Sequence, residues 1–139
     1  MERPASRVRV CFEDGRVSRV ELLKSPAKAG KLPREIREYL SGRRRRFSIK
    51  PVLRGAPFHV KVWKALMRVP YGRAVTYSEL ARMAGSPRAA RAVGQAMHAN
   101  PTPLIVPCHR VVASGGKLGG FSCGLEWKKF LLDLETKKP

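Results

Sequence analysis

The sequence predicts an α/β protein in which a small N-terminal α/β lobe precedes a mainly helical C-terminal domain with a helix-turn-helix. In residues 1–54, apolar and polar residues alternate in short runs, as in strands, whereas apolar residues recur at three- and four-residue spacing after that point. The chain has 139 residues, which is enough for one domain or two small lobes. Because Arg54-Gly55-Ala56-Pro57 is typical of a linker, we expect the lobe to cover residues 1–54 and the second domain residues 55–139.

The N-terminal lobe is expected to contain a hairpin, a helix and one further strand. Apolar residues alternate on both sides of Asp14-Gly15, which predicts a β-hairpin over residues 7–23. Residues 33–42 favour a short helix that starts at a proline and ends at a glycine. The spacing of apolar residues over 47–53 favours a further strand.

The second domain is expected to begin with three helices. Apolar residues at helical spacing favour an amphipathic helix over 58–69. Thr76 or Ser78 can cap a second, shorter helix that ends before the next glycine. Ser86-Pro87 favours the start of a third helix over 87–99. The last two helices, with a glycine-containing turn between them, form the candidate helix-turn-helix.

The rest of the chain is expected to contain a long shaped loop and a final helix. Three prolines and five glycines over residues 100–124 favour irregular structure there. An apolar stripe that includes Trp127 and Leu131 favours a helix over 125–135.

The net charge favours nucleic acid as a partner. Lys and Arg number 29 against 10 Asp and Glu, which gives +19 and a pI near 11.1. Such an excess favours a polyanion, and the chain has no run of ~18 apolar residues that would point to a membrane. Three cysteines form no disulfide framework, and no signal-peptide pattern opens the chain, so a cytoplasmic, reduced protein is expected. Gln95 and Asn100 are the only side-chain amides, which favours a hot habitat.

Cys108 and His109 form the candidate reactive pair. A thiolate needs a cationic setting, which Arg110 offers, and the adjacent imidazole can accept the thiol proton directly or through a water. A carboxylate on the other ring nitrogen would fix the tautomer, and Glu135 and Glu126 are the candidates. Taken alone, a cysteine in an apolar run is more often a packed small hydrophobe.

The predicted third helix is rich in small residues. Ala89, Ala90, Ala92 and Gly94 surround Arg91, so a smooth face could approach a DNA groove while Arg91 enters the base stack. Tight helix packing with a solvated Arg91 is the alternative. His59 and His98 have no zinc-like spacing from other ligands, and the arginines at 43–46 favour a solvated, phosphate-attracting patch.

Several short motifs resemble one known family. They are Pro-Cys-His-Arg-Val-Val at 107–112, Ala-Ala-Arg-Ala-Val-Gly at 89–94, Asn100-Pro101, Val-Pro-Tyr-Gly at 69–72 and Thr-Tyr-Ser at 76–78. Together with the glycine loop and Glu135 they resemble the O6-alkylguanine-DNA alkyltransferases, also called methylated-DNA–protein-cysteine methyltransferases. The resemblance covers about residues 57–136.

The resemblance implies a single-turnover repair protein that moves an alkyl group from guanine O6 in double-stranded DNA to its own Cys108. It implies that His109 is a water-mediated base, Glu135 its orienting carboxylate and Asn100 the link between the helix-turn-helix and the active-site loop. It further implies that Tyr77 binds guanine N3 and that Arg91 fills the space left by the flipped nucleotide. The implied DNA-contacting residues also include Ala89, Ala90, Ala92, Gly94, Gln95, Thr76 and Ser78, and the implied base pocket contains Met97, Val111, Leu118, Gly119, Phe121 and Ser122.

The same resemblance implies a monomer that needs no cofactor. Three departures from the family pattern stand out: Phe121 replaces a frequent tyrosine, Cys123 replaces a common glycine, and the lobe carries Cys11 without a zinc-binding set, so no metal is expected. Two alternatives have other activities: a helix-turn-helix protein that recognises alkylated DNA without repairing it, and a Cys-His hydrolase.

Overall fold

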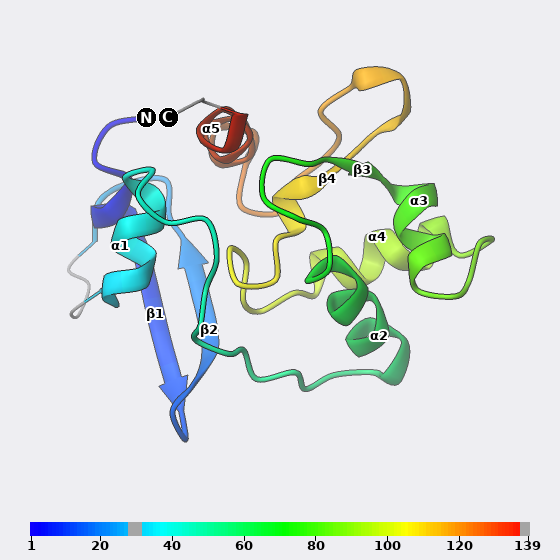
Figure 1. Ribbon diagram of the computed structural model, residues 1–139, viewed down its shortest axis with the longest axis horizontal. Coiled ribbons are helices and arrows are strands. Elements are labelled where there is room, and N and C mark those ends of the chain that lie inside the picture. The colour runs from blue at the N-terminus through cyan, green and yellow to red at the C-terminus, as the bar shows by residue number, and fades with distance from the viewer. Residues whose placement is uncertain (28–31, 137–139) are drawn as a thin grey trace.

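A computed structural model describes residues 1–27 and 32–136, and it confirms the predicted α/β class (Figure 1). The hairpin over residues 8–22 and the helix over 34–40 lie on one side of the molecule, and the helices over 57–66, 77–83 and 90–98 lie on the other (Figure 1). The elements in chain order are η1 (Pro4–Arg7), β1 (Val8–Glu13), β2 (Arg16–Leu22), α1 (Arg34–Leu40), α2 (Pro57–Leu66), β3 (Val75–Thr76), α3 (Tyr77–Met83), α4 (Ala90–His98), η2 (Cys108–Arg110), β4 (Val111–Val112), η3 (Ser114–Gly116) and α5 (Leu125–Thr136).

The predicted hairpin is present, but its alternation breaks near the turn. β1 and β2 pair antiparallel, from Val8 opposite Leu22 to the turn at Gly15, whose φ of +77° suits glycine. The register shifts between Cys11 and Phe12 because β2 carries an extra residue there. Phe12 is consequently 51% exposed instead of lying on the buried face.

The prediction of a further strand over residues 47–53 is wrong. Only an isolated bridge joins this segment to β2, through hydrogen bonds from Val17 N to Lys50 O (2.9 Å) and from Val52 N to Val17 O (2.7 Å). Pro51 has no N–H to donate, and the Glu35 carboxylate accepts the backbone N–H groups of residues 48 and 49. These groups are therefore not available to extend a sheet.

Two predicted helix boundaries also need correction. α2 ends at Leu66 instead of residue 69, and Met67, its C-cap, is 38% exposed. α4 begins at Ala90 instead of Pro87, because residues 86–89 form a turn in which Ala89 N donates to Ser86 O at 3.0 Å. The proline therefore occupies a turn and not the first turn of the helix.

Thr76, one of the two predicted caps, begins α3. Its side chain accepts a hydrogen bond from Glu79 N (3.1 Å), and the Glu79 carboxylate accepts one from Thr76 N (3.0 Å). This capping box fixes the start of the helix.

The segment predicted to be irregular, residues 100–124, contains one short strand that pairs with a strand before α3. β3 and β4 form a parallel two-stranded sheet, with Val75 opposite Val111 and Thr76 opposite Val112. The pairing joins the start of α3 to the turn that carries Cys108. Two-residue strands are too short to produce a periodic pattern in the sequence.

Two hydrophobic cores support this arrangement. The first lies among α2, α3, α4 and β4, and the Trp63 indole donates across it to Ala96 O at 2.8 Å. The second joins the hairpin and α1 to Leu104, Ile105, Trp127 and Leu131 from the later part of the chain. A boundary at residue 54 stays a prediction. Among the described residues, no helix has the length and hydropathy that a membrane span requires.

Candidate active site

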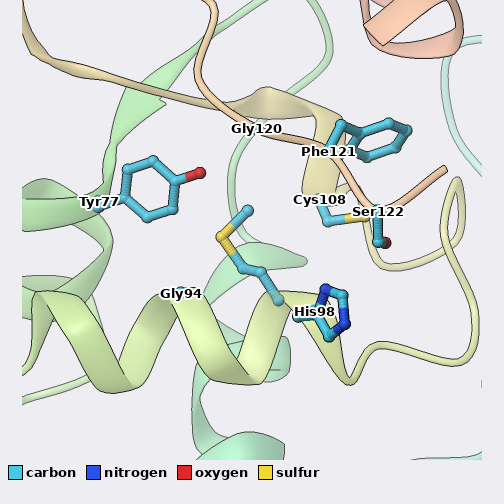
Figure 2. A pocket seen from close by; sticks show the side chains of 8 residues that line it. Tyr77, Gly94, His98, Cys108, Gly120, Phe121 and Ser122 are labelled. Carbon is cyan, nitrogen blue, oxygen red and sulfur yellow. The ribbon is translucent and has the colours of Figure 1, made fainter. Parts of the chain in front are cut away.

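A cavity of about 340 Å³ lies between α4 and the loop over residues 120–122 (Figure 2). The hydroxyl of Tyr77 points toward it from the start of α3, and Cys108 borders it from the η2 turn (Figure 2). The cavity is lined by Tyr77, Gly94, Met97, His98, Cys108, Gly120, Phe121 and Ser122.

Cys108 is a buried thiol at the wall of this cavity. It is 3% exposed and opens the η2 turn, where its N–H donates to Val106 O at 2.8 Å. Burial raises the pKa of the thiol to about 12, and the side chain of Asn100 opposes that rise. The resting sulfur is therefore a protonated thiol at neutral pH.

Asn100 connects the end of α4 to the loop before the cysteine. Its amide donates to Val106 O at 3.0 Å, and its side-chain oxygen accepts from Thr102 N at 3.0 Å. Inside this closed loop, the buried residue Leu104 adopts a left-handed φ of +77°. Because Asn100 holds both sides of the loop, it fixes the position of the Cys108 turn relative to α4.

Glu135 of α5 is the carboxylate that meets His109. The His109 Nε2 to Glu135 Oε2 distance is 2.8 Å, and both side chains are buried. The other candidate, Glu126, is largely exposed and lies 3.7 Å from Arg7. The hydroxyl of Tyr39, from α1, also donates to Glu135 Oε2 at 2.5 Å.

Arg110 completes the environment of this carboxylate. It donates through Nε and Nη2 to the two oxygens of Glu135, both at 2.9 Å, and through Nη1 to Val69 O at 2.7 Å. Burial raises the pKa of Glu135, but the hydrogen bonds from His109 and Arg110 outweigh it and hold the pKa well below the usual range. Glu135 is therefore ionised and fully partnered.

These contacts determine the tautomer of His109. Burial lowers the pKa of the imidazole, against the opposing effect of Glu135, so the ring is neutral near pH 7. The proton lies on Nε2, which faces the carboxylate. Nδ1 is buried and has no hydrogen-bond partner within the described residues, so its lone pair is free to accept a proton.

Lys128 is a further ionisable group that sequence reasoning missed. It is 0% exposed, and its ammonium donates to Gly120 O at 3.0 Å. A Cβ built on Gly119 would lie 3.5 Å from Lys128 Nζ and 3.6 Å from Tyr77 Oη, so the ammonium and the phenol border the same spot. Burial lowers the pKa of this lysine, which the nearby thiol partly opposes.

The sequence did carry a signal for this lysine. Lys128, Leu131 and Glu135 are three and four residues apart on α5, so they share the face that is turned inward. Tyr39 gave no comparable signal, because it lies 96 residues before Glu135 and on another element.

The residues expected to contact DNA form two groups. Arg91, Gln95 and Ser78 are exposed, whereas Ala89, Ala90 and Ala92 are half-buried along α4. Thr76 uses its side chain in the capping box, and Gly94 lines the cavity.

The residues expected in the base pocket also form two groups, those that line the cavity and those that do not. Met97, Phe121 and Ser122 line the cavity, whereas Val111, Leu118 and Gly119 do not. The cavity adds His98, which the sequence analysis did not assign to the pocket, and Gly120 of the loop over residues 118–122, which the family resemblance places in the pocket. Within residues 1–27 and 32–136, no three His, Cys, Asp or Glu side chains are grouped as a metal site would need.

Comparison with known proteins identifies the family. The model of the family described as "6-O-methylguanine DNA methyltransferase, DNA binding domain" matches residues 57–137, more than half of the chain. The chain belongs to the 6-O-methylguanine DNA methyltransferase family.

Relatives of this family are longer than the chain. A methylated-DNA–protein-cysteine methyltransferase of Methanosarcina barkeri is 49% identical over 102 residues, which is 73% of this chain and 65% of that protein. An inducible methylated-DNA–protein-cysteine methyltransferase of Bacillus subtilis is 45% identical over 103 residues, 74% of this chain and 58% of that protein. The matched segment therefore spans less than two thirds of the length of these relatives.

Solved structures also resemble this chain. The Mycobacterium tuberculosis OGT in complex with DNA superposes with a TM-score of 0.82 and 36% identity, over 91% of this chain and 84% of that one. Schizosaccharomyces pombe Atl1, in complex with damaged DNA containing O6-carboxymethylguanine, matches with a TM-score of 0.53 and 40% identity over 59% of this chain and 78% of its own.

Proposed function

We propose that this protein repairs O6-alkylguanine in duplex DNA by transferring the alkyl group to Cys108 in a single, irreversible event. The observation that carries the proposal is a buried cysteine on a cavity wall, followed in the chain by a histidine that is hydrogen-bonded to a buried carboxylate. The names of the methyltransferase relatives support the same activity.

DNA binding is proposed to use α3 and α4 as a helix-turn-helix in the minor groove. The half-buried alanines of α4 leave room for close approach, and exposed Arg91 is free to enter the stack. The cavity opens beside α4, where Gly94 and Met97 line it, so a nucleotide turned out of the duplex would meet it directly. Extruding the base costs a few kcal/mol, which groove contacts and Arg91 offset.

The transfer then requires a thiolate, which the resting protein does not hold. The thiol proton moves through a water to Nδ1 of His109, while Glu135 stabilises the imidazolium that forms. The sulfur attacks the alkyl carbon, the S–C bond forms and the C–O6 bond breaks. The electron pair of the broken C–O6 bond passes to the purine. The proton that the thiol released then returns through solvent and neutralises the guanine anion.

Tyr77 and Lys128 are proposed to favour the charged states along this path. Tyr77 directs its hydroxyl toward guanine N3, and burial raises the pKa of the phenol, which keeps it a donor. The Lys128 ammonium stabilises the Cys108 thiolate and holds the pocket loop through Gly120. Because a thioether is stable, the protein does not turn over.

Damage recognition without repair is the second candidate function. It is favoured by the likeness to Atl1, whose structure contains damaged DNA. The cysteine in the cavity argues for transfer instead, since a recognition protein needs no nucleophile there.

Mass analysis after incubation with duplex DNA containing O6-methylguanine tests both candidates. We expect one methyl group per protein, on the Cys108 peptide, with no further turnover when DNA is in excess. Cys108→Ser should bind the same duplex without gaining mass. An unchanged wild-type mass despite lesion-selective binding would favour recognition alone, and a methyl group on Cys123 would contradict the assigned acceptor.

We further infer that the protein acts as a monomer in the cytoplasm, where its proposed DNA substrate is found, and that it works at high temperature. Light scattering tests whether the protein is a monomer. Thermal unfolding tests the working temperature, and an unfolding midpoint above ~90 °C would mark hyperstability.

A further inference from the structure

A second cavity lies on the other side of the Cys108 turn. Its volume is about 510 Å³, and it shares no lining residue with the active-site cavity. Cys108 faces the active-site cavity, whereas Pro107 and Arg110 of the same turn line the second one. We call this second cavity the rear cleft, and its walls come from residues 45–47, 49–50, 67–71, 104–105, 107 and 110.

The rear cleft gathers positive charge, most of which has no acidic partner among the described residues. Five cationic side chains line it and no carboxylate does; the cations are Arg45, Arg46, Lys50, Arg68 and Arg110. Within the described part of the chain, only Arg110 of these five forms an ion pair. Like charges that share a small volume repel one another, so an anion in the cleft would relieve an existing cost.

The adjacent arginine provides a contrast. Arg44 lies in the same run of four arginines but pairs with Glu38 at 2.9 Å and with Glu35 at 3.7 Å. The acids on α1 therefore neutralise the arginine that faces the lobe, and they leave Arg45 and Arg46 exposed and directed to the cleft.

The floor of the cleft is already ordered. Arg110 is fixed by Glu135 and Val69 O, and its guanidinium lies over the ring of Tyr71, with Cζ 5.8 Å from the ring centroid. Arg45 covers the same ring at 5.4 Å. A rigid guanidinium and a stacked aromatic floor, surrounded by exposed cations, suit the phosphates and sugars of a nucleic-acid strand.

We propose that the rear cleft binds the phosphate backbone of a second segment of nucleic acid, separate from the segment that α4 engages. The proposal rests on the proposed function only in treating α4 as the first DNA surface. A backbone fits better than a single small anion, because Arg45, Arg46 and Lys50 are all exposed and the cations come from three separate parts of the chain.

The first test measures the affinity for unmodified duplex DNA as a function of salt. The triple variant Arg45→Ala/Arg46→Ala/Lys50→Ala should lower the slope of log K against log salt by about 0.9 for each phosphate that the variant no longer neutralises. The control variant Arg16→Ala/Arg34→Ala/Arg37→Ala removes the same charge from exposed positions that do not line the cleft. Equal slopes for the two variants would overturn the proposal, because net charge alone would then explain the change.

The second test asks whether one protein joins two duplexes. Two separately labelled duplexes, one of which carries O6-methylguanine, should show energy transfer with the wild type and the control variant but not with the cleft variant. Absence of energy transfer in the wild type would overturn the second-segment proposal. Methyl transfer is scored on the same samples, so failure of transfer with intact energy transfer would contradict the proposed function alone.

Tripolyphosphate titration separates the two sources of phosphate. If tripolyphosphate binding depends on the cleft cations while the cleft variant leaves the salt slope for DNA unchanged, the cleft binds a small polyphosphate. That result would overturn the nucleic-acid proposal. Tripolyphosphate that displaces the second duplex while the first remains bound would support it.

Discussion

The chemistry of single residues here is governed by burial. Glu135 accepts hydrogen bonds from the side chains of Tyr39, His109 and Arg110 and from one backbone N–H, so it keeps its charge in the interior. Removing one member of such a buried group leaves another charge unpaired, which costs about 3 to 5 kcal/mol. The same burial raises the pKa of Cys108 and lowers the pKa of His109, so both are neutral at rest.

The raised pKa of Cys108 predicts how it reacts with a small alkylating agent. A thiol with a pKa of about 12 holds little thiolate at neutral pH. Its rate with iodoacetamide should therefore rise about tenfold per pH unit from pH ~7 to ~10, whereas free cysteine levels off above its pKa of about 8.5. Peptide mass analysis over time gives the rate at each pH. A plateau near pH 8 would show that the protein stabilises the thiolate without a substrate.

Lys128 should matter for transfer more than for DNA binding. Lys128→Met keeps most of the buried volume but removes the charge and the hydrogen bond to Gly120, and we expect the rate of methyl transfer to fall about a hundredfold. Lys129→Met is the matched control, because Lys129 is the next residue in the chain and its side chain is exposed. Single-turnover rates and duplex affinities are measured for both, and an equal loss of rate in the control would contradict the role. Partial recovery in Lys128→Arg would separate charge from packing.

At the scale of elements, short connections hold the site together. Thr76 caps α3, whose first residue is Tyr77. The β3–β4 pairing joins this point to the turn that carries Cys108. The phenol and the thiol, which are 31 positions apart in the sequence (108 − 77), are therefore held by adjacent backbone.

Loss of the cap should weaken this junction. Thr76→Ala removes the acceptor for Glu79 N, and the free energy of unfolding should fall by about 1 kcal/mol. Ser78→Ala, at an exposed position in the same turn, should change it by less than about 0.5 kcal/mol. Urea unfolding curves compare the two, and a similar loss in both would mean that the capping box does not stabilise α3.

Periodicity in the sequence was sufficient to predict the hairpin, α2 and α5, because each buries one face, whereas α3 was predicted from its cap and the glycine that follows it. It failed for residues 47–53, where the apolar spacing was that of a strand but Pro51 and the Glu35 carboxylate took the place of a sheet partner. It also could not choose between Glu135 and Glu126, since that choice depends on where α5 lies relative to the Cys108 turn. Tyr39 and the rear cleft depend on contacts between lobes, which no local pattern records.

At the scale of the whole molecule, the second core joins both halves of the chain. The Trp127 indole donates to Leu23 O at 2.8 Å, and Val20 N donates to Pro101 O at 2.9 Å. Tyr39 reaches from α1 to Glu135 of α5. The lobe thus helps to position Glu135 and its partner His109, as well as covering apolar surface.

A fragment of residues 55–139 should therefore fold poorly by itself. It would expose Trp127 and Leu131, which are 1% and 0% exposed in the whole chain. We expect weak near-ultraviolet circular dichroism and strong binding of a hydrophobic dye, as in a loosely packed state. A fragment with a sharp, cooperative melting transition would instead support two independent domains divided near residue 54.

The shared core also bears on what becomes of a molecule after use. If neither half stays folded when the other opens, as the fragment prediction expects, a protease meets either the intact chain or all of it. If an alkyl group on Cys108 loosens the wall beside the cavity, the apolar surface of both halves becomes accessible together. Spent molecules would then be removed by the same quality control that degrades unfolded chains, without a dedicated degradation signal.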